Sequence, residues 1–420
     1  MLSHINMCYM HIFENNIESE NIQPIAKVLL HLAIIEFFFF SGEVYYTSVL
    51  LGGGKIKLLF VITCGVYYFL QRDNFENVVN NSKKLIAIIF WVLICTYLFG
   101  HGSHGFQWAD YAQFSIGIYL LCSSVDFDRF RNLLLKYLIW LSVISIIVQI
   151  GHDYLGIFPA STYIDARGEP RYLSLGLFTT EWGENRLASI FWEPGQYQIV
   201  IYYILVLFAD EWSDISKIGS SIRKFGVLIL AIVLTLSTTA YFILGFVMLT
   251  ILVRSGSNYL KYVPIILVLG CTAMYFIYNS EAVQKKVEQQ ENENTQESSY
   301  TIRLADNIAC LMVTMEDPLT GFGPGSDEME NRLFSEGSET SSNGWFYGSA
   351  QLGIPYILFL WICMWRNVRR INKQSNTFLL FMILLLSQAN ESVIYFPYIF
   401  MYVFQFSERK QLLEETIEDA

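Results

Sequence analysis

An arginine and a carboxylate stand seven residues apart at the start of an apolar run, where they could bind and orient a ligand. The stretch from residue 181 to 196 is EWGENRLASIFWEPGQ, and it contains Arg186, Glu193 and Pro194. Pro194 suits the first turn of a helix, and Glu193 before it would interact favourably with the positive end of that helix. The two tryptophans of the stretch, with the arginine as their anchor, also fit an aromatic belt at a membrane interface. Arg186 and Glu193 are therefore candidate catalytic residues, with the aromatic belt as the alternative.

A second arginine stands on a predicted helix over Tyr300–Met315. Arg303, Asn307 and Cys310 share one face of this helix. Apolar side chains recur at helical spacing on a different face, at Ile302, Ala305, Ile308, Leu311 or Met312, and Met315. Asp317-Pro318 is expected to end the helix. Arg303 is the third candidate catalytic residue, and Asn307 is a candidate substrate contact.

A glycine-rich turn, LTGFGPG, follows this helix at residues 319–325. Gly321 and Gly323 allow backbone conformations that are closed to other residues and permit close approach to a ligand. A nucleotide-binding fold would need a strand before such a turn, and none is expected here. The further candidate substrate contacts are Asn343, before the next apolar run, and Arg167 and Arg171 in the earlier segment. The last two are either substrate contacts or solvated turn residues.

The charge of the second segment limits how an anion could be bound. Residues 279–342 contain thirteen acidic and four basic residues, a net charge of −9. Such a segment would not attract anions in general. An anionic substrate must therefore be held by a few placed arginines, whose planar fork pairs with phosphate oxygens and stays charged at any working pH.

The composition of the chain indicates a membrane protein. Apolar residues make up 53% of it and charged residues only 15%, against roughly 25% charged in soluble domains. The charged outer stripes of a soluble helical protein are absent. We therefore expect an all-α integral membrane protein with about twelve transmembrane helices of ~20 residues each. The expected spans are residues 26–46, 56–71, 85–100, 109–124, 133–150, 196–210, 224–237, 239–254, 262–279, 344–365, 376–389 and 392–406.

The positions of lysine and arginine predict that both termini are cytoplasmic. With that orientation, eighteen of the 27 basic residues lie inside, and both long polar segments lie outside. The seven cysteines fall mostly within apolar spans and imply no disulfide framework. The expected organisation is a cytoplasmic tail 1–25, helices 1–5 in 26–150, a first large periplasmic loop 151–195, helices 6–9 in 196–279, a second large periplasmic loop 280–343, helices 10–12 in 344–406, and a cytoplasmic tail 407–420.

Three stretches together resemble the O-antigen polymerase and ligase family (Wzy-type polymerases). The first, RLASIFWEPG at 186–195, is similar to that family's Arg…Phe-x-Glu-Pro-Gly segment, which enters a membrane helix. The second, LSTTAY at 236–241, looks like its Ser/Thr-rich break between two short apolar helices. The third runs from Arg303 through the glycine-rich turn and Asn343 to Gly353, and it is similar to the family's large outer loop and following helix.

The resemblance implies a GT-C-like membrane glycosyltransferase of the bacterial inner membrane that polymerises O-antigen or capsule repeats. Its donor would be an oligosaccharide linked to undecaprenyl pyrophosphate, and no cofactor, metal ion or nucleotide sugar is implied. Arg186 and Arg303 would hold the pyrophosphate, Glu193 would orient or deprotonate the acceptor hydroxyl, and Asn343 would contact the glycan. Membrane lipid, and in some systems a chain-length regulator, would be the partners; nucleic acid is not expected.

Other functions stay open. A flippase or transporter of the same lipid-linked sugar would place ionisable residues within its spans, where Glu36, Glu43 and Asp110 are available. A ligase is a second alternative, although the ligase branch uses an outer-loop histidine and the two large loops of this chain contain only His152, at the membrane edge. A purely structural or receptor protein is the third.

Overall fold

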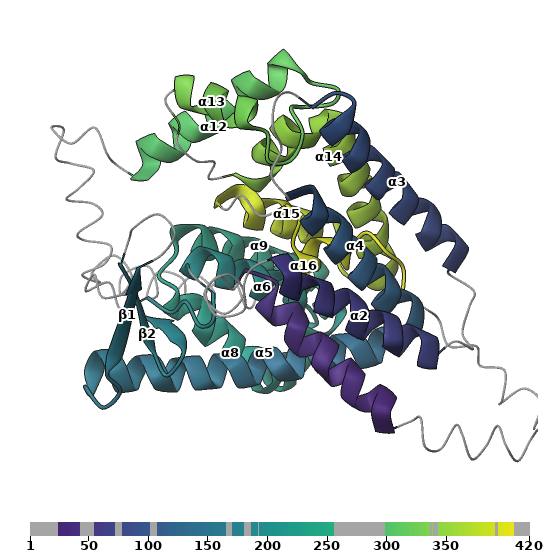
Figure 1. Ribbon diagram of the computed structural model, residues 1–420. Coiled ribbons are helices and arrows are strands. Elements are labelled where there is room, and N and C mark those ends of the chain that lie inside the picture. Colours follow the sequence, from purple (N-terminus) through teal and green to yellow (C-terminus); the bar gives the residue numbers. More distant parts are fainter. Residues whose placement is uncertain are drawn as a thin grey trace, which may run out of the picture.

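The computed structural model is mostly helical (Figure 1). It describes residues 24–42, 54–71, 78–100, 107–164, 170–179, 186–191, 193–255, 299–336, 338, 343–390 and 394–406. The expected span at 262–279, both predicted tails apart from residues 24 and 25, and the candidate residue Arg167 lie outside the described residues.

Helices occupy most of the expected spans. Before the first polar segment these are a helix over residues 24–39, α2 (Gly54–Leu70), α3 (Val78–Tyr97), α4 (Gln107–Ser124), and α5 (Phe127–Gln149), which continues into the π-helical turn η2 (Ile150–Tyr154). Between the two polar segments they are α6 (Pro194–Val206), α7 (Ala209–Trp212), η3 (Ile215–Lys217), α8 (Ile218–Leu234) and α9 (Thr238–Arg254). After them come α12 (Ser299–Glu316), α13 (Asp327–Ser335), α14 (Gly344–Ile371), α15 (Thr377–Ser387), η5 (Gln388–Asn390) and α16 (Pro397–Phe400).

Two of the described helices are long and apolar enough to cross a bilayer. They are Phe127–Tyr154 and Gly344–Ile371, of 28 residues each. Lys57–Leu70, Thr238–Arg254 and Thr377–Ser387 are apolar but shorter. Two such helices are a weak indication of a membrane protein, because buried helices of soluble proteins share these properties. The count of twelve spans stays a prediction.

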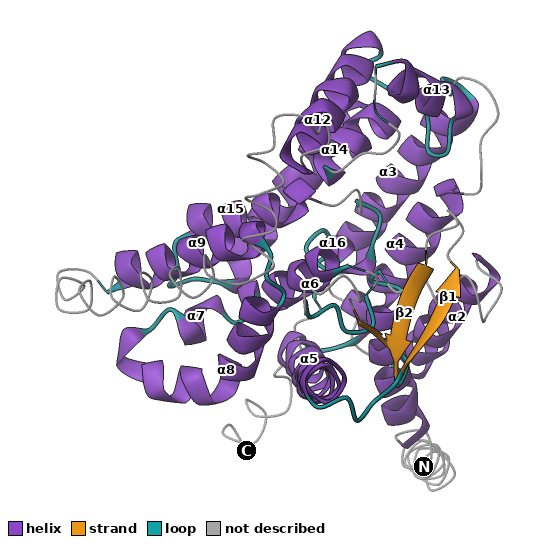
Figure 2. Cartoon of the chain, turned by 90° about the vertical axis from the view of Figure 1, so that its left-hand side faces the viewer, coloured by secondary structure: helices purple, strands orange, loops and turns teal. Residues whose placement is uncertain are grey.

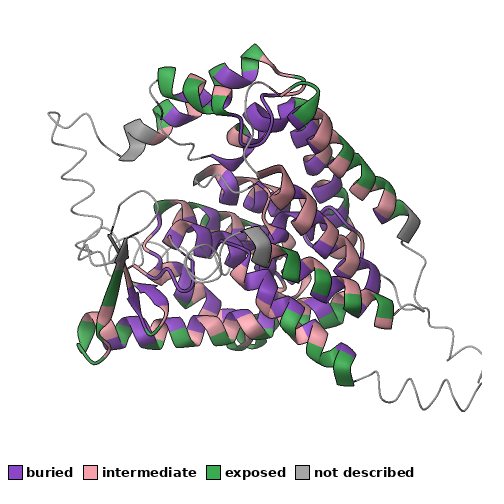
Figure 3. Cartoon of the chain, in the orientation of Figure 1, coloured by how far each residue is buried: buried purple, intermediate pink, exposed green. Residues whose placement is uncertain are grey.

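The centre of the bundle is α6. Every residue of this helix except Gly195 is buried, and it packs against α5, α8, α9, α15 and α16. Figure 3 shows this buried interior, with exposed residues concentrated on the outer helices and on α12 and α13. The segment that carries Arg186 and Glu193 therefore leads directly into the core of the molecule.

The last expected span is not a helix over its described part. Residues 394–406 contain only the short α16, and turns follow it. Pro397 begins α16 and cannot donate a backbone hydrogen bond to a preceding turn. Nearly the whole segment is nevertheless buried in the bundle.

Polar side chains of α3 and α14 bind the backbone of this segment in place of helical hydrogen bonds. The bonds run from Lys84 Nζ to Val403 O (2.7 Å), from Asn367 Nδ2 to Tyr402 O (2.7 Å) and Phe404 O (3.1 Å), from Asn81 Nδ2 to Gln405 O (2.7 Å), and from Gln405 N to Asn81 Oδ1 (2.9 Å). Within a membrane, non-helical backbone is tolerated where other protein groups satisfy its hydrogen bonds. The expectation of a twelfth helix at 392–406 was wrong because these tertiary partners are invisible in local apolar composition.

The first long polar segment contains a small antiparallel sheet that the sequence pattern did not predict. Strands β1 (Ala160–Ile164), β2 (Pro170–Ser174) and β3 (Leu177–Thr179) pair in that order. Leu175 and Gly176 join β2 to β3 with φ values of 50° and 81°, as a two-residue hairpin turn requires. The sheet lies at the end of α5 (Figures 1 and 2).

Candidate functional site

Arg186 lies against the turn between α8 and α9. Its Nε donates to Thr235 O at 3.1 Å, and the neighbouring Leu187 N donates to Leu234 O at 2.9 Å. The predicted break between two apolar helices is confirmed here, since α8 ends at Leu234 and α9 begins at Thr238. The guanidinium therefore binds a carbonyl at the negative end of α8, where a cation is favourable. Two stretches that the sequence analysis treated separately form one structural unit.

Glu193 is the N-cap residue of α6, and Pro194 occupies the first turn as predicted. The backbone of Glu193 is extended, and its carbonyl accepts from Gln196 N (3.2 Å) and Tyr197 N (3.3 Å). Its half-buried side chain makes no capping hydrogen bond and has no ion-pair partner in the described part of the chain. The carboxylate is thus held at the positive end of a buried helix with its oxygens available.

The chain between Arg186 and Glu193 is fixed from several sides. Ser189 has a φ of 62°, and its Oγ accepts from Ser145 Oγ of α5 at 2.7 Å. Ser189 O accepts from Phe178 N of β3 at 2.8 Å. The Phe191 ring stacks on Tyr197 of α6, with 5.5 Å between the ring centroids. The two candidate residues are therefore rigidly positioned.

Arg303 and Asn307 lie one turn apart on α12. The helix spans Ser299–Glu316 and ends before Asp317-Pro318, as predicted. Within the described residues the half-buried Arg303 makes no hydrogen bond or ion pair, and the buried Oδ1 of Asn307 has no donor. The neighbouring Asp306 accepts from Ser338 Oγ at 2.6 Å. This turn of α12 therefore offers a cation and an unpaired amide oxygen.

The glycine-rich turn binds a break in α14. Gly353 interrupts α14 with a φ of 76°, and Pro355 follows it. Four hydrogen bonds satisfy the backbone groups around the break: Phe322 N to Ala350 O (2.9 Å), Gly323 N to Gln351 O (2.9 Å), Ile354 N to Pro318 O (2.9 Å) and Trp91 Nε1 to Leu352 O (2.8 Å).

The close approach at these glycines is between two backbones. A Cβ on Gly321 would lie 2.6 Å from Ala350 O, and a Cβ on Gly353 would overlap Leu319 O. Gly321 and Gly323 have φ values of 63° and 87°. The structure thus supplies a packing reason for the glycines, and their predicted contact with substrate stays a prediction.

The remaining candidates have local structural settings. Asn343 is the N-cap of α14, and its Oδ1 accepts from Trp345 N (3.0 Å) and Phe346 N (3.3 Å). Arg171 lies on β2, where it pairs with Tyr163 of β1. In the described ranges, no three His, Cys, Asp or Glu side chains lie together as metal ligands would.

The two arginines stand on separate parts of the molecule. Arg186 lies on the α8–α9 turn, whereas α12 packs against α13 and α14. In both Figure 1 and Figure 2, α15 and α9 lie between α12 and α8. No contact between described residues joins the two side chains, so their convergence on one substrate stays a prediction.

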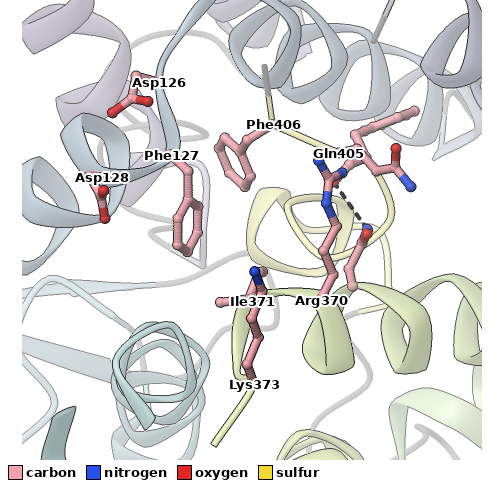
Figure 4. Close-up of a pocket in the computed structure, with 10 residues that line it drawn as sticks. Asp126, Phe127, Asp128, Arg370, Ile371, Lys373, Gln405 and Phe406 are labelled. Carbon is pink, nitrogen blue, oxygen red and sulfur yellow. Dashed lines mark hydrogen bonds between the residues drawn. The ribbon is translucent and has the colours of Figure 1, made fainter. Parts of the chain in front are cut away.

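Away from both arginines, a cavity of about 300 Å³ lies between the start of α5 and the end of α14 (Figure 4). Asp126 and Asp128 line one side, and Arg370 and Lys373 line the other. Arg370 and Lys373 are among the eighteen basic residues from which a cytoplasmic face is predicted, and the sequence pattern predicts no site there.

No family model, no curated protein and no solved structure matches this chain.

Proposed function

We propose that this protein is a multi-pass inner-membrane polysaccharide polymerase, GT-C-like, with both termini cytoplasmic. It transfers a glycan from undecaprenyl pyrophosphate to a hydroxyl of a second lipid-linked repeat. The observation that carries the proposal is the turn of α12 where Arg303 lacks a counterion among the described residues and Asn307 Oδ1 lacks a donor. A cation beside an unpaired amide suits a substrate that combines phosphate with sugar hydroxyls.

The reaction forms a bond between the acceptor oxygen and the anomeric carbon of the donor. The bond from that carbon to the pyrophosphate oxygen breaks, and its electron pair leaves with the lipid pyrophosphate. Preorganised cations in a water-poor site stabilise this developing charge. Arg303 and Arg186 supply them, while Glu193 orients the acceptor hydroxyl or takes its proton, and Asn343 contacts the glycan.

Complementation of a deletion strain tests the assignment. Arg303→Ala and Arg186→Ala should abolish long-chain polymer on gels at normal protein level. Lysine should rescue poorly, because it cannot grip two phosphate oxygens at once. Arg332→Ala is the matched control: this arginine of α13 is already paired with Glu328 at 2.9 Å, so polymer should persist. Full polymer length in both alanine variants would remove the assignment.

A flippase of lipid-linked sugar is the second candidate, and Glu36 favours it. This carboxyl is buried in the helix over residues 24–39, where Thr63 Oγ1 donates to its Oε1 at 3.1 Å and its Oε2 has no partner. Buried ionisable groups within spans often mark transport pathways. A deletion strain separates the candidates: a missing polymerase leaves single repeats at the cell surface, whereas a missing flippase leaves lipid-linked repeats in the cytoplasmic leaflet.

A further inference from the structure

One face of α12 is apolar and exposed. Its side chains recur at helical spacing and are 44–67% exposed. This apolar stripe comprises Leu304, Ile308, Leu311, Met312, Met315 and, just beyond the helix, Leu319. Helical periodicity predicts Ile308, Leu311 or Met312, and Met315 as part of an apolar stripe, and these side chains are exposed; Leu304 and Leu319 were not predicted.

The opposite face of α12 already provides its attachment to the protein. Ala309, Cys310 and Val313 are buried in a small apolar cluster of their own. The other members of the cluster are Phe322, Met329, Leu333 and Ala350, with Tyr347 against it. The stripe is thus not needed to hold α12 in place, and a row of large apolar side chains on an outer helix needs another partner.

The attachment point places α12 at the depth of a membrane interface. Thr314 Oγ1 and Ser349 Oγ are 3.0 Å apart in a hydrogen bond, and Ser349 lies in the second turn of α14. The part of α14 after the break at Gly353, residues 354–371, is about 27 Å long, close to the hydrocarbon thickness of about 30 Å. If this part spans the hydrocarbon, the first turns of α14, before the break, lie at the level of the lipid headgroups.

Exposed apolar side chains continue beyond this level on α14 itself. Ile354, Leu358 and Ile362 are exposed at intervals of four residues, which is the pattern of a helix face in contact with lipid. The apolar stripe of α12 thus belongs to a part of the protein whose neighbouring helix also presents apolar side chains.

Charge argues for apolar insertion rather than for an electrostatic partner. The first turn of α13, beside α12, carries Asp327, Glu328 and Glu330. These carboxylates would repel anionic lipids and would face water. The apolar stripe contains no charged side chain, so its binding energy must come from buried apolar area.

We propose that α12 is an interfacial helix whose apolar stripe is inserted into the outer leaflet of the bilayer. This inference rests on the membrane placement in the proposed function and adds a lipid-binding surface to it. Arg303 is carried by the same helix and would then be held at the headgroup level. A lipid-linked pyrophosphate lies at that same level, so the helix receives its substrate by lateral diffusion in the leaflet.

Photocrosslinking of the full chain in cell membranes tests this. Benzoylphenylalanine is placed at Ile308 or Met312, and the adducts are identified by mass. Leu358 of α14 is the positive control, and the exposed Asn331 of α13 is the water-facing control. Phospholipid adducts should form at Ile308 and Met312 as they do at Leu358, and they should be absent at Asn331.

The controls distinguish the insertion of α12 from the membrane placement of the whole protein. Adducts with protein, or no lipid adducts, at Ile308 and Met312 would overturn the inference if Leu358 still captures lipid. Absence of lipid adducts at Leu358 as well would contradict the membrane placement, and with it the proposed function.

Discussion

The two long polar segments each present one candidate arginine, but they hold it in opposite ways. Arg186 donates to Thr235 O and lies in a stretch fixed to α5, α6, β3 and the α8–α9 turn. Arg303 stands on a helix with an exposed apolar face and has no partner among the described residues. Arg186 thus has a backbone partner before any ligand binds, whereas Arg303 has no counterion among the described residues.

The largest effect on stability should come from the contact between the glycine-rich turn and the break in α14, which attaches the second polar segment to the bundle. Gly353→Ala places a Cβ against Leu319 O at a φ of 76°, and we expect a loss of about 2–4 kcal/mol. The measurement is the thermal unfolding of purified protein in detergent. Gly245→Ala is the control, because a Cβ there has no neighbour within 4 Å. Equal unfolding temperatures for the two variants would show that the contact is unimportant.

The second prediction separates the two arginines directly. Arg186→Ala leaves Thr235 O without its donor and should lower the free energy of unfolding by about 1–2 kcal/mol. Arg303→Ala removes no described contact and should change it by less than about 0.5 kcal/mol. Thermal unfolding of the two variants checks the difference. An Arg303 variant as destabilised as the Arg186 variant would contradict the contrast between the segments.

A smaller effect should follow from loosening α12. Thr314→Val keeps the side-chain shape and removes the hydrogen bond to Ser349 at 3.0 Å. We expect a loss of about 1 kcal/mol and faster hydrogen exchange in α12. Ser335→Ala, on the exposed end of α13, should leave both measurements unchanged. If α12 exchanges at the wild-type rate in the Thr314 variant, this bond does not hold the helix.

The smallest effect should be a dependence of stability on acid pH that comes from Asp214, between α7 and α8. Neither arginine can produce it, because neither titrates in this range. Hydrogen bonds from Ser216 Oγ (2.6 Å) and N (3.0 Å) to Asp214 hold the pKa of its carboxyl below the usual value. This stabilisation is therefore present above the unfolded pKa of about 3.9 and is lost as pH falls through the lower folded pKa. Thermal unfolding between pH 6 and 3 measures it, and Asp214→Asn should flatten that part of the profile. A profile identical to wild type would remove the role of Asp214.

Local signals in the sequence were sufficient where they act within a few residues. Pro194 in the first turn of α6, a break between α8 and α9, and the end of α12 before Pro318 were all predicted. Each depends on a proline, or on a change from apolar to polar residues, that sets the backbone without help from distant groups.

Signals that depend on tertiary partners were missed. The predicted helix at 392–406 failed because Asn81, Lys84 and Asn367 supply its backbone bonds. The short strands β1–β3 were missed because each offers only a few residues of pattern. Periodicity found the apolar stripe of α12, but it contains no information on what covers that face.

The non-helical backbone of residues 394–406 has a consequence for the order of assembly. In the proposed membrane placement, such a segment cannot enter lipid alone, since its carbonyls would be left without donors. It is synthesised after α3 and α14, whose Asn81, Lys84 and Asn367 provide those donors. Insertion of the carboxyl-terminal part must therefore wait until the earlier helices have come together and formed a polar slot to receive it.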